Sequence, residues 1–158
     1  NDMSKTTYIM IFVVVLLLIF SSLRLFTSKS NLKTITQKIK DQDFTLEIAD
    51  TPYLLAKGLG NRQELCQNCG MLFKFPILSV QTFWMKDTLI PLDIIFIDQN
   101  KQISDIYTAQ PEIGVNDSNL KKYTSSRPSL YVIELNAGSA KKLNLNSGDY
   151  LKINSPNN

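Results

Sequence analysis

The stretch from residue 70 to residue 98 constrains the fold of this chain more than any other. It holds three short apolar runs of strand length, at residues 71–75, 80–85 and 92–97. Pro76 and Pro91 separate the runs, and proline cannot donate a hydrogen bond to a sheet ladder. The stretch therefore predicts consecutive short β-strands.

Length and charge limit what surrounds these strands. The chain has 158 residues, which leaves room for one domain with a hydrophobic core. Residues 31–158 carry 14 basic and 13 acidic side chains, a balance that argues against nucleic acid as a partner. The chain has no histidine, so the commonest acid–base group and metal ligand is absent. We expect neither a cofactor nor a metal ion.

An apolar run lies near the N-terminus. Residues 8–23 contain no charge, and the run reaches the length of a membrane span at residue 26 if Arg24 extends to the interface. We predict an uncleaved signal anchor at 8–26, after a short segment at 1–7 and before a polar tether at 27–33. The alternative is a signal peptide cleaved near Ser30, which would release the domain.

Two signals in the sequence disagree on which side of the membrane the domain lies. One lysine precedes the apolar run, whereas Arg24, Lys29 and Lys33 lie after it, which favours the cytoplasm for the domain. N-terminal signals with short leading segments usually export the domain behind them. We expect a bacterial domain that faces the periplasm or the cell exterior.

The domain is predicted at residues 34–154. Thr51 and Pro52 suit the start of a short helix that ends at Gly58 or Gly60, and a second short helix is expected at 137–143. Residues 110–129 form a long polar loop. Strands are expected at 34–39, 44–48, 71–75, 80–85, 92–97, 103–109, 130–135 and 150–153. The fold class is mainly β, a compact β-barrel-like domain behind one transmembrane helix.

Several short sequence motifs, which follow one another along the chain, resemble those of a known family. They are Gly58-Leu59 with Arg62, Gly70-Met71-Leu72-Phe73, Phe83-Trp84-Met85-Lys86-Asp87-Thr88, Pro91-Leu92-Asp93-Ile94, Glu134-Leu135-Asn136-Ala137-Gly138 and Gly148-Asp149. Over residues 35–153 the chain resembles the family of domain of unknown function 192, also called uncharacterised protein family 0127. The resemblance implies a compact β-rich domain, often behind a signal or anchor. This chain departs from the family at two positions: the family usually has Met where this chain has Gly60, and Asn where it has Asp87.

Charged residues next to apolar runs mark the candidate site. The strand at 92–97 is apolar on both faces, so Asp93 is expected to be buried, with Lys86, Arg62 or backbone amides near Thr88 as partners. Glu134 has a similar setting. One interpretation is a cleft that binds a polar ligand, and the favoured alternative is a structural ion pair. The candidate ligand-binding residues are Arg62, Trp84, Lys86, Asp87, Asp93 and Glu134, although Trp84 and Met85 are also typical of a core.

Cys66 and Cys69 lie in a predicted loop, with two residues between them. A redox-active pair usually lies at a helix N-terminus, and one such pair without histidine gives too few ligands for a closed zinc site. A structural disulfide or free thiols are therefore favoured over redox or metal chemistry, and a disulfide would suit an exported domain.

Three functions remain open. The first is a non-enzymatic binding or accessory module for a small polar ligand or a partner protein. The second is a hydrolase or transferase that uses Asp93 or Glu134 beside Lys86. The third is thiol–disulfide exchange through Cys66 and Cys69. No phosphate-binding loop or nucleophile elbow occurs in the sequence, which favours the binding module over an enzyme.

Overall fold

The structure is a computed structural model that describes residues 5, 10–16 and 32–154. The chain divides into two units, Asn1–Asn31 and Leu32–Asn158. Of the predicted anchor at 8–26, residues 10–16 are helical, and the remainder lies outside the described residues. No helix within the described ranges combines the length and the apolar content that crossing a membrane requires.

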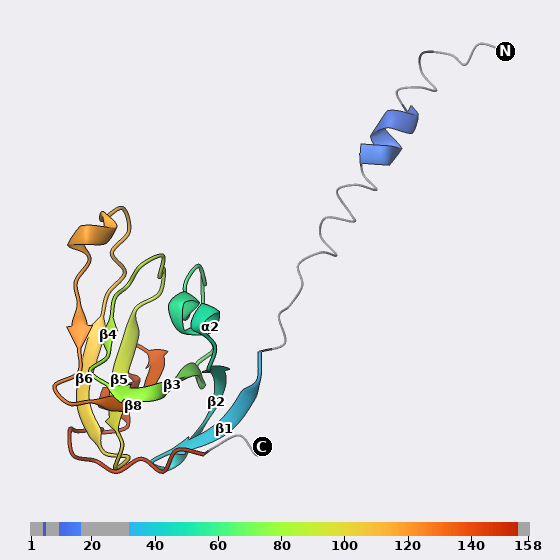
Figure 1. Cartoon of the computed structure of the whole chain (residues 1–158). Helices are drawn as coiled ribbons and strands as arrows, with labels where there is room; N and C mark the ends of the chain where they lie inside the picture. The colour runs from blue at the N-terminus through green and yellow to red at the C-terminus, as the bar shows by residue number, and fades with distance from the viewer. Residues whose placement is uncertain (1–4, 6–9, 17–31, 155–158) are drawn as a thin grey trace. The chain divides into compact units, whose positions relative to one another are not determined.

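The second unit consists mainly of β-strands, with a few short helices (Figure 1). This confirms the prediction of a mainly β domain. In chain order the elements are β1 Thr34–Ile39, β2 Gln42–Ala49, α2 Pro52–Lys57, β3 Cys69–Ser79, β4 Thr82–Phe83, β5 Leu92–Asp98, β6 Ile103–Ala109, the 3-10 helix η1 Asp117–Asn119, β7 Tyr123–Thr124, β8 Ser129–Asn136 and α3 Ser139–Lys142.

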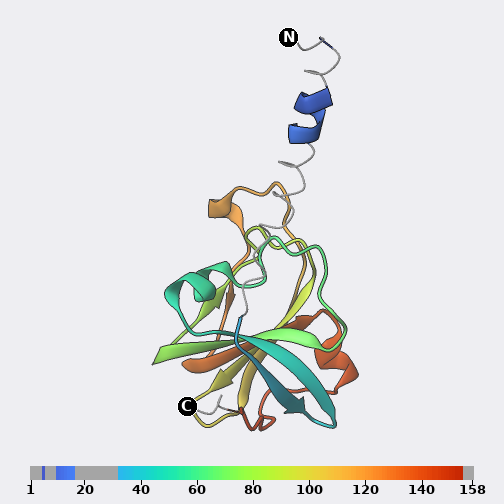
Figure 2. The same ribbon diagram turned by 90° about the vertical axis from the view of Figure 1, so that its right-hand side faces the viewer.

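Six strands form one mixed sheet in the order β1-β2-β3-β8-β5-β6, and β4 pairs with β7 in a small second sheet. The pairing of β2 with β3 is parallel, and the other pairs in the main sheet are antiparallel. Figure 2 shows β1 and β2 at one edge of this sheet, in blue and teal. The prediction of a barrel-like sheet is wrong, because β1 and β6 are edge strands and no ladder joins them in the described part of the chain.

The C-terminal segment explains this difference. A strand was expected at 150–153, but that segment forms only an isolated bridge between Gln102 and Tyr150. Its other hydrogen bonds are single contacts: the Leu151 amide donates to the Lys101 carbonyl oxygen, and Gln37 of β1 donates to the Lys152 carbonyl oxygen. The segment thus contacts both edges of the sheet without forming a ladder with either.

Proline has a milder effect on β3 than the sequence suggested. The strand continues through Pro76, but its regular pairing with β8 ends at Lys74 and resumes only at Ser79. The expected strand at 80–85 is reduced to the two residues of β4.

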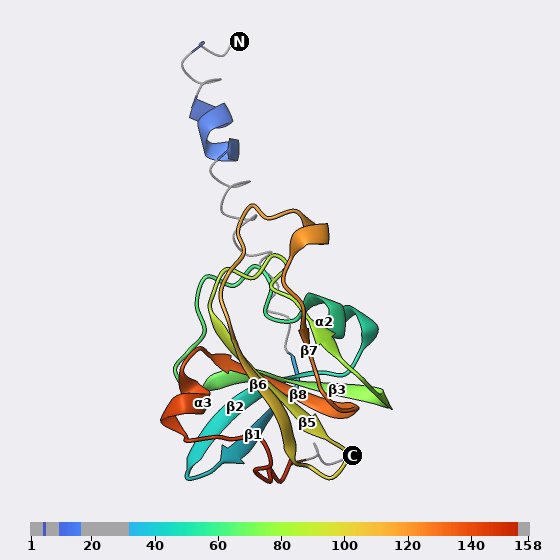
Figure 3. The ribbon, with the colours of Figure 1, turned by 90° about the vertical axis from the view of Figure 1, so that its left-hand side faces the viewer.

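The sheet is covered on both faces. Side chains alternate along β5, so that Ile95 and Ile97 join one apolar cluster and Ile94 and Phe96 join another. The first cluster includes Ala140 of α3, and we call that side the α3 face. The second is covered by α2 and by residues 83–90, and we call it the α2 face. Figure 3 shows the two helices well separated.

Helix α2 begins and ends as its sequence predicts. The Thr51 hydroxyl accepts a hydrogen bond from the Leu54 amide, and Pro52 occupies the first turn. Gly58 ends the helix with φ of 50°, in the left-handed region that favours glycine, and its amide donates to the Leu54 carbonyl oxygen.

The predicted polar loop at 110–129 contains the helix η1 and the strand β7. In all three ribbon views the loop with η1, the turn at 84–91 and α2 gather at the same end of the main sheet (Figures 1, 2 and 3). The candidate site lies among these segments.

Candidate functional site

A pocket with a volume of about 180 Å³ opens on the α2 face. It lies between the end of α2, the strands β3 and β4, and the residues after β4. Its apolar lining is rich in aromatic rings, namely Phe73, Phe75, Phe83 and Trp84. The rings of Phe73 and Phe83 meet edge to face, with centroids 4.9 Å apart, which is a preferred aromatic geometry.

Glu134 supplies the acidic group of this pocket. It lies on β8 opposite Met71 of β3 and Ile94 of β5, both of which belong to the α2 face. The residue is 6% exposed, and its Oε2 atom is buried and has no hydrogen-bond partner among the described residues. Burial raises the pKa of the Glu134 carboxyl to about 8, and the positive charge of Arg62 only partly opposes this.

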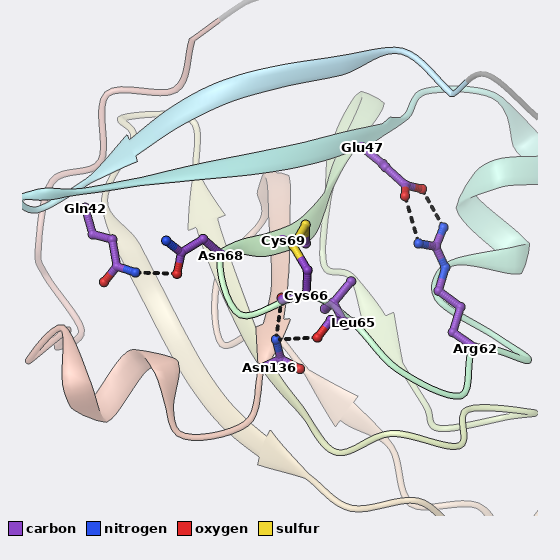
Figure 4. The surroundings of a disulfide bond; sticks show 8 residues. All are labelled: Gln42, Glu47, Arg62, Leu65, Cys66, Asn68, Cys69 and Asn136. Carbon is purple, nitrogen blue, oxygen red and sulfur yellow. Dashed lines mark hydrogen bonds and ion pairs between the residues drawn. A yellow bond between two sulfur atoms is a disulfide. The ribbon is translucent and has the colours of Figure 1, made fainter.

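Arg62 does not pair with Glu134. Its guanidinium makes a two-pronged contact with Glu47 of β2, with Nη1 2.7 Å from Oε1 and Nη2 2.5 Å from Oε2 (Figure 4). This hydrogen-bonded contact raises the pKa of Arg62. Arg62 therefore lies near two acidic side chains, Glu47 and Glu134, and its guanidinium donates its hydrogen bonds to Glu47.

Gly58 leaves space beside the acidic group. A Cβ atom at this position would lie 3.3 Å from Cζ of Phe73 and 3.9 Å from Oε2 of Glu134. The absence of a side chain at Gly58 thus leaves the space between Phe73 and Glu134 open. The sequence indicated Gly58 only as a possible helix end, and nothing in the spacing of Gly58 and the phenylalanines indicated that they line a pocket.

Trp84 forms part of the pocket wall. Its side chain is 46% exposed, so it does not belong to the core. The Lys122 ammonium lies 4.1 Å from the centre of its ring, within the range of a cation–π contact. The neighbouring Met85 is 2% exposed and belongs to the core.

Lys86 lines the same pocket at its exposed side and forms an ion pair with Asp117 of η1. The hydrogen bond from Lys86 to Asp117 raises the pKa of the lysine. The contact links the loop at 110–129 to the residues after β4. Because the lysine stays protonated, it offers positive charge and hydrogen-bond donors.

Asp87 lies next to Lys86 but lines a different, smaller pocket of about 130 Å³. Its backbone has φ of 52°, a left-handed conformation that asparagine and aspartate tolerate better than most residues. Its carbonyl oxygen accepts a hydrogen bond of 2.7 Å from the Asn61 amide. Asp87 thus shapes the backbone between the two pockets.

Asp93 is on the opposite side of the sheet. It is fully buried on the α3 face, where Oδ1 accepts a hydrogen bond from the Thr108 hydroxyl at 2.7 Å and Oδ2 accepts one from the Ala140 amide at 2.8 Å. The expected burial is observed, but neither Lys86 nor Arg62 is its partner. The side chain joins α3 to two strands and has no contact with the pocket.

Cys66 and Cys69 are joined by a disulfide bond (Figure 4). Cys69 begins β3, and the Cys66 carbonyl oxygen accepts hydrogen bonds from the Cys69 amide and from the Asn136 side chain. The disulfide therefore lies between a loop and a strand, without the helix N-terminus that lowers the pKa of reactive thiols.

The structure thus brings together three of the six candidate residues, Trp84, Lys86 and Glu134, in one pocket. Arg62 lies near Glu134, Asp87 lines the adjacent pocket, and Asp93 is separate. No group of three or more Cys, Asp or Glu side chains that suits a metal ion occurs among the described residues.

Two solved structures are similar to this chain. One is a protein of unknown function from Novosphingobium aromaticivorans DSM 12444, with 31% identity and a TM-score of 0.68 over 80% of this chain and 89% of that protein. The other is a "putative transcription regulator" from Sinorhizobium meliloti 1021, with 34% identity and a TM-score of 0.64 over 77% of this chain and 90% of that protein.

Among curated proteins, none matches this chain. A family model does match, over residues 33–153, and its description is DUF192, Uncharacterized ACR. The match includes all six strands of the main sheet and the pocket on the α2 face. The chain therefore belongs to the family of domain of unknown function 192.

Proposed function

We propose that the domain is a binding module that holds a small polar ligand in the pocket in front of Glu134. The observation that carries this proposal is the unpaired, buried carboxyl in the wall of an open pocket. Leaving a buried polar atom without a partner costs about 1–3 kcal/mol, more if it is charged. A ligand that binds Glu134 would remove this cost.

The arrangement of the neighbouring charges supports a binding role over a purely structural one. A structural ion pair would place Arg62 on Glu134, but Arg62 is bound to Glu47 at both nitrogens. Asp93, in contrast, has both carboxylate oxygens satisfied by the protein and suits the structural interpretation. The two buried acids thus have different roles in this proposal.

Trp84 provides a direct test, because it is the single tryptophan of the chain and lines the pocket. Its fluorescence can be followed while a panel of small molecules is added to the full chain. The panel includes cationic, neutral and anionic compounds. We expect saturable changes with some fragments. The variant Ala56→Phe, which adds bulk at an exposed pocket residue, should reduce them, and Ala56→Ser should not. Unchanged emission throughout the panel, or equal binding to Ala56→Phe, would contradict the proposal.

A catalytic role is the second candidate, since a carboxyl with a pKa of about 8 holds a proton near neutral pH and can act as a general acid. Lys86, which Asp117 keeps protonated, would contribute electrostatically and not as a nucleophile. Turnover of nitrophenyl esters, phosphates or glycosides that disappears in Glu134→Gln would support this hydrolase. Equal turnover in that variant would exclude Glu134 as its acid.

We further propose that residues 8–26 anchor the domain to a membrane and that the domain faces the periplasm or the exterior. The charge-free run supports an anchor, and the Cys66–Cys69 disulfide suits an oxidising compartment. Fractionation of cells, followed by protease treatment of spheroplasts, tests both points. Protection of the domain from protease would place it in the cytoplasm and contradict the proposed orientation.

A further inference from the structure

We infer that the ligand of this pocket is a small organic cation, an amine or guanidine with an apolar body. Its charged group would lie at Glu134 and its body among Phe73, Phe83 and Trp84. The inference rests on the proposed binding function and adds the chemical class of the ligand.

The acidic group inside the pocket supports a cation. Glu134 is the acidic side chain among the residues that line it, and no residue in the described part of the chain hydrogen-bonds to its Oε2 atom. Arg62, the cation that lowers the pKa of Glu134, cannot pair with it without breaking its two contacts with Glu47. An ammonium or guanidinium group brings both the missing donor and the compensating charge.

The aromatic walls support the same class of ligand. The faces of aromatic rings attract cations, most strongly when both are removed from water. Phe73, Phe83 and Trp84 line the pocket together with Glu134. One ring already makes such a contact, since the Lys122 ammonium lies 4.1 Å from the centre of Trp84. A carboxyl group beside aromatic rings therefore favours a cation with apolar substituents.

The basic residues at the mouth limit the charge of the ligand. Lys57 and Lys86 line the pocket but are exposed, and Lys86 is paired with Asp117. Water and salt screen exposed charges, so these lysines weaken but do not cancel the attraction of Glu134. A ligand with one positive charge fits this pattern better than one with two.

The volume limits the size of the ligand. Apolar cavities of about 150 Å³ bind benzene, and this pocket, with about 180 Å³, is slightly larger. Benzylamine, benzyl alcohol and benzoate are thus suitable probes, because they share one ring and differ in charge. Their binding is measured through Trp84 fluorescence of the full chain.

We expect benzylamine to bind most tightly and benzyl alcohol at least about tenfold more weakly, with benzoate weakest of the three. Glu134→Gln should remove the preference for the amine. The matched control Glu64→Gln removes an exposed carboxylate outside the pocket and should retain the preference.

The unmodified chain gives a second readout. A cation binds the ionised form of Glu134, so the affinity for benzylamine should fall about tenfold for each pH unit below about 8. The charged neighbours are Arg62, Glu47, Lys57 and Lys86 with its partner Asp117, and the chain has no histidine to contribute near neutral pH.

The outcomes of these experiments test the cationic ligand separately from the proposed binding function. Benzoate or benzyl alcohol binding as tightly as benzylamine would overturn the cation inference and leave the proposed pocket in place. Tighter amine binding that persists in Glu134→Gln would also overturn it. No change with any of the three probes would overturn the inference as well, and the fragment panel with Ala56→Phe would then judge the binding function separately.

Discussion

At the scale of single residues, Glu134 links burial, pH and function. Its folded-state pKa of about 8 exceeds the value near 4.3 of a free glutamate side chain. Between these two values the folded state holds more protons than the unfolded state. The free energy of unfolding therefore falls as the pH rises through this window, by up to about 1.4 kcal/mol per pH unit from this group.

The variant Glu134→Gln tests this linkage, because the amide does not titrate. We expect the free energies of unfolding of variant and wild type to agree most closely near pH 5 and the variant to be more stable near pH 8. Urea denaturation at both pH values measures the difference. Glu64→Gln should keep the wild-type pH dependence, and parallel profiles for wild type and Glu134→Gln would contradict a raised pKa.

Gly70 is required for a different reason, the close approach of three strands. A Cβ atom at this position would lie 2.4 Å from the Glu134 carbonyl oxygen and 2.8 Å from a methyl group of Leu46. We expect Gly70→Ala to destabilise the fold by about 3 kcal/mol or more. Gly114→Ala, where no atom lies within 4 Å, should cost about 1 kcal/mol through its positive φ alone. Equal melting temperatures for the two variants would contradict this explanation.

At the scale of elements, Asp93 attaches helix α3 to the sheet. Its carboxylate accepts hydrogen bonds from Ala140 of α3 and from Thr108 of β6. We expect Asp93→Ala to lower the free energy of unfolding by about 3 kcal/mol, because the buried Ala140 amide loses its acceptor and the hydrogen bond to the Thr108 hydroxyl is lost as well. Trp84 fluorescence titrations of the folded variant should match the wild type. Loss of probe binding at unchanged stability would instead place Asp93 in the binding site.

The disulfide stabilises the loop that precedes β3. Closing a loop of four residues stabilises a protein by about 2 kcal/mol in the chain-entropy model. We expect the double variant Cys66→Ser with Cys69→Ser to lose about that amount in urea denaturation. Asn136 still binds the loop through the Leu65 and Cys66 carbonyl oxygens, so the native fold should persist. Wild type under reducing conditions is the control and should behave like the variant.

At the scale of the whole molecule, the C-terminal segment connects the two edges of the open sheet. Gln37 of β1 is 1% exposed, donates to the Lys152 carbonyl oxygen and accepts from the Asn154 amide. At the other edge, the Ile103 amide donates to the Asp149 carbonyl oxygen. The segment that was expected to form a further strand, residues 150–153, thus connects the two edges through single hydrogen bonds.

This arrangement makes Gln37 a sensitive position. We expect Gln37→Ala to lower the free energy of unfolding by about 2–3 kcal/mol, since the buried side chain loses its hydrogen bonds to the Lys152 carbonyl oxygen and the Asn154 amide. Gln42→Ala, which removes an exposed hydrogen bond to Asn68, should change it by less than about 1 kcal/mol. Thermal or urea denaturation compares the two, and similar losses would contradict a special role of the C-terminal contact.

The local elements were predictable because their signals are local. Alternating apolar side chains indicated β2, and the Thr51-Pro52 pair and Gly58 marked the ends of α2. The burial of Asp93 was expected from the apolar residues on both sides of β5. Each of these inferences depends on neighbours in the sequence and on period-two or capping patterns.

Which residues meet depends on how the strands pair. Asp93 and Glu134 lie in adjacent strands. Glu134 pairs with Ile94, the residue after Asp93, so the side chains of Asp93 and Glu134 point to opposite faces of the sheet. Arg62 binds Glu47 because a parallel pairing puts β2 beside β3, which local pattern does not reveal. The six strands of the main sheet, the two short helices and the family thus follow from the sequence, whereas the expected strand at 150–153 is only a bridge and the one at 80–85 is reduced to β4. The strand order determined the open sheet and the pocket, because both depend on contacts between residues far apart in the chain.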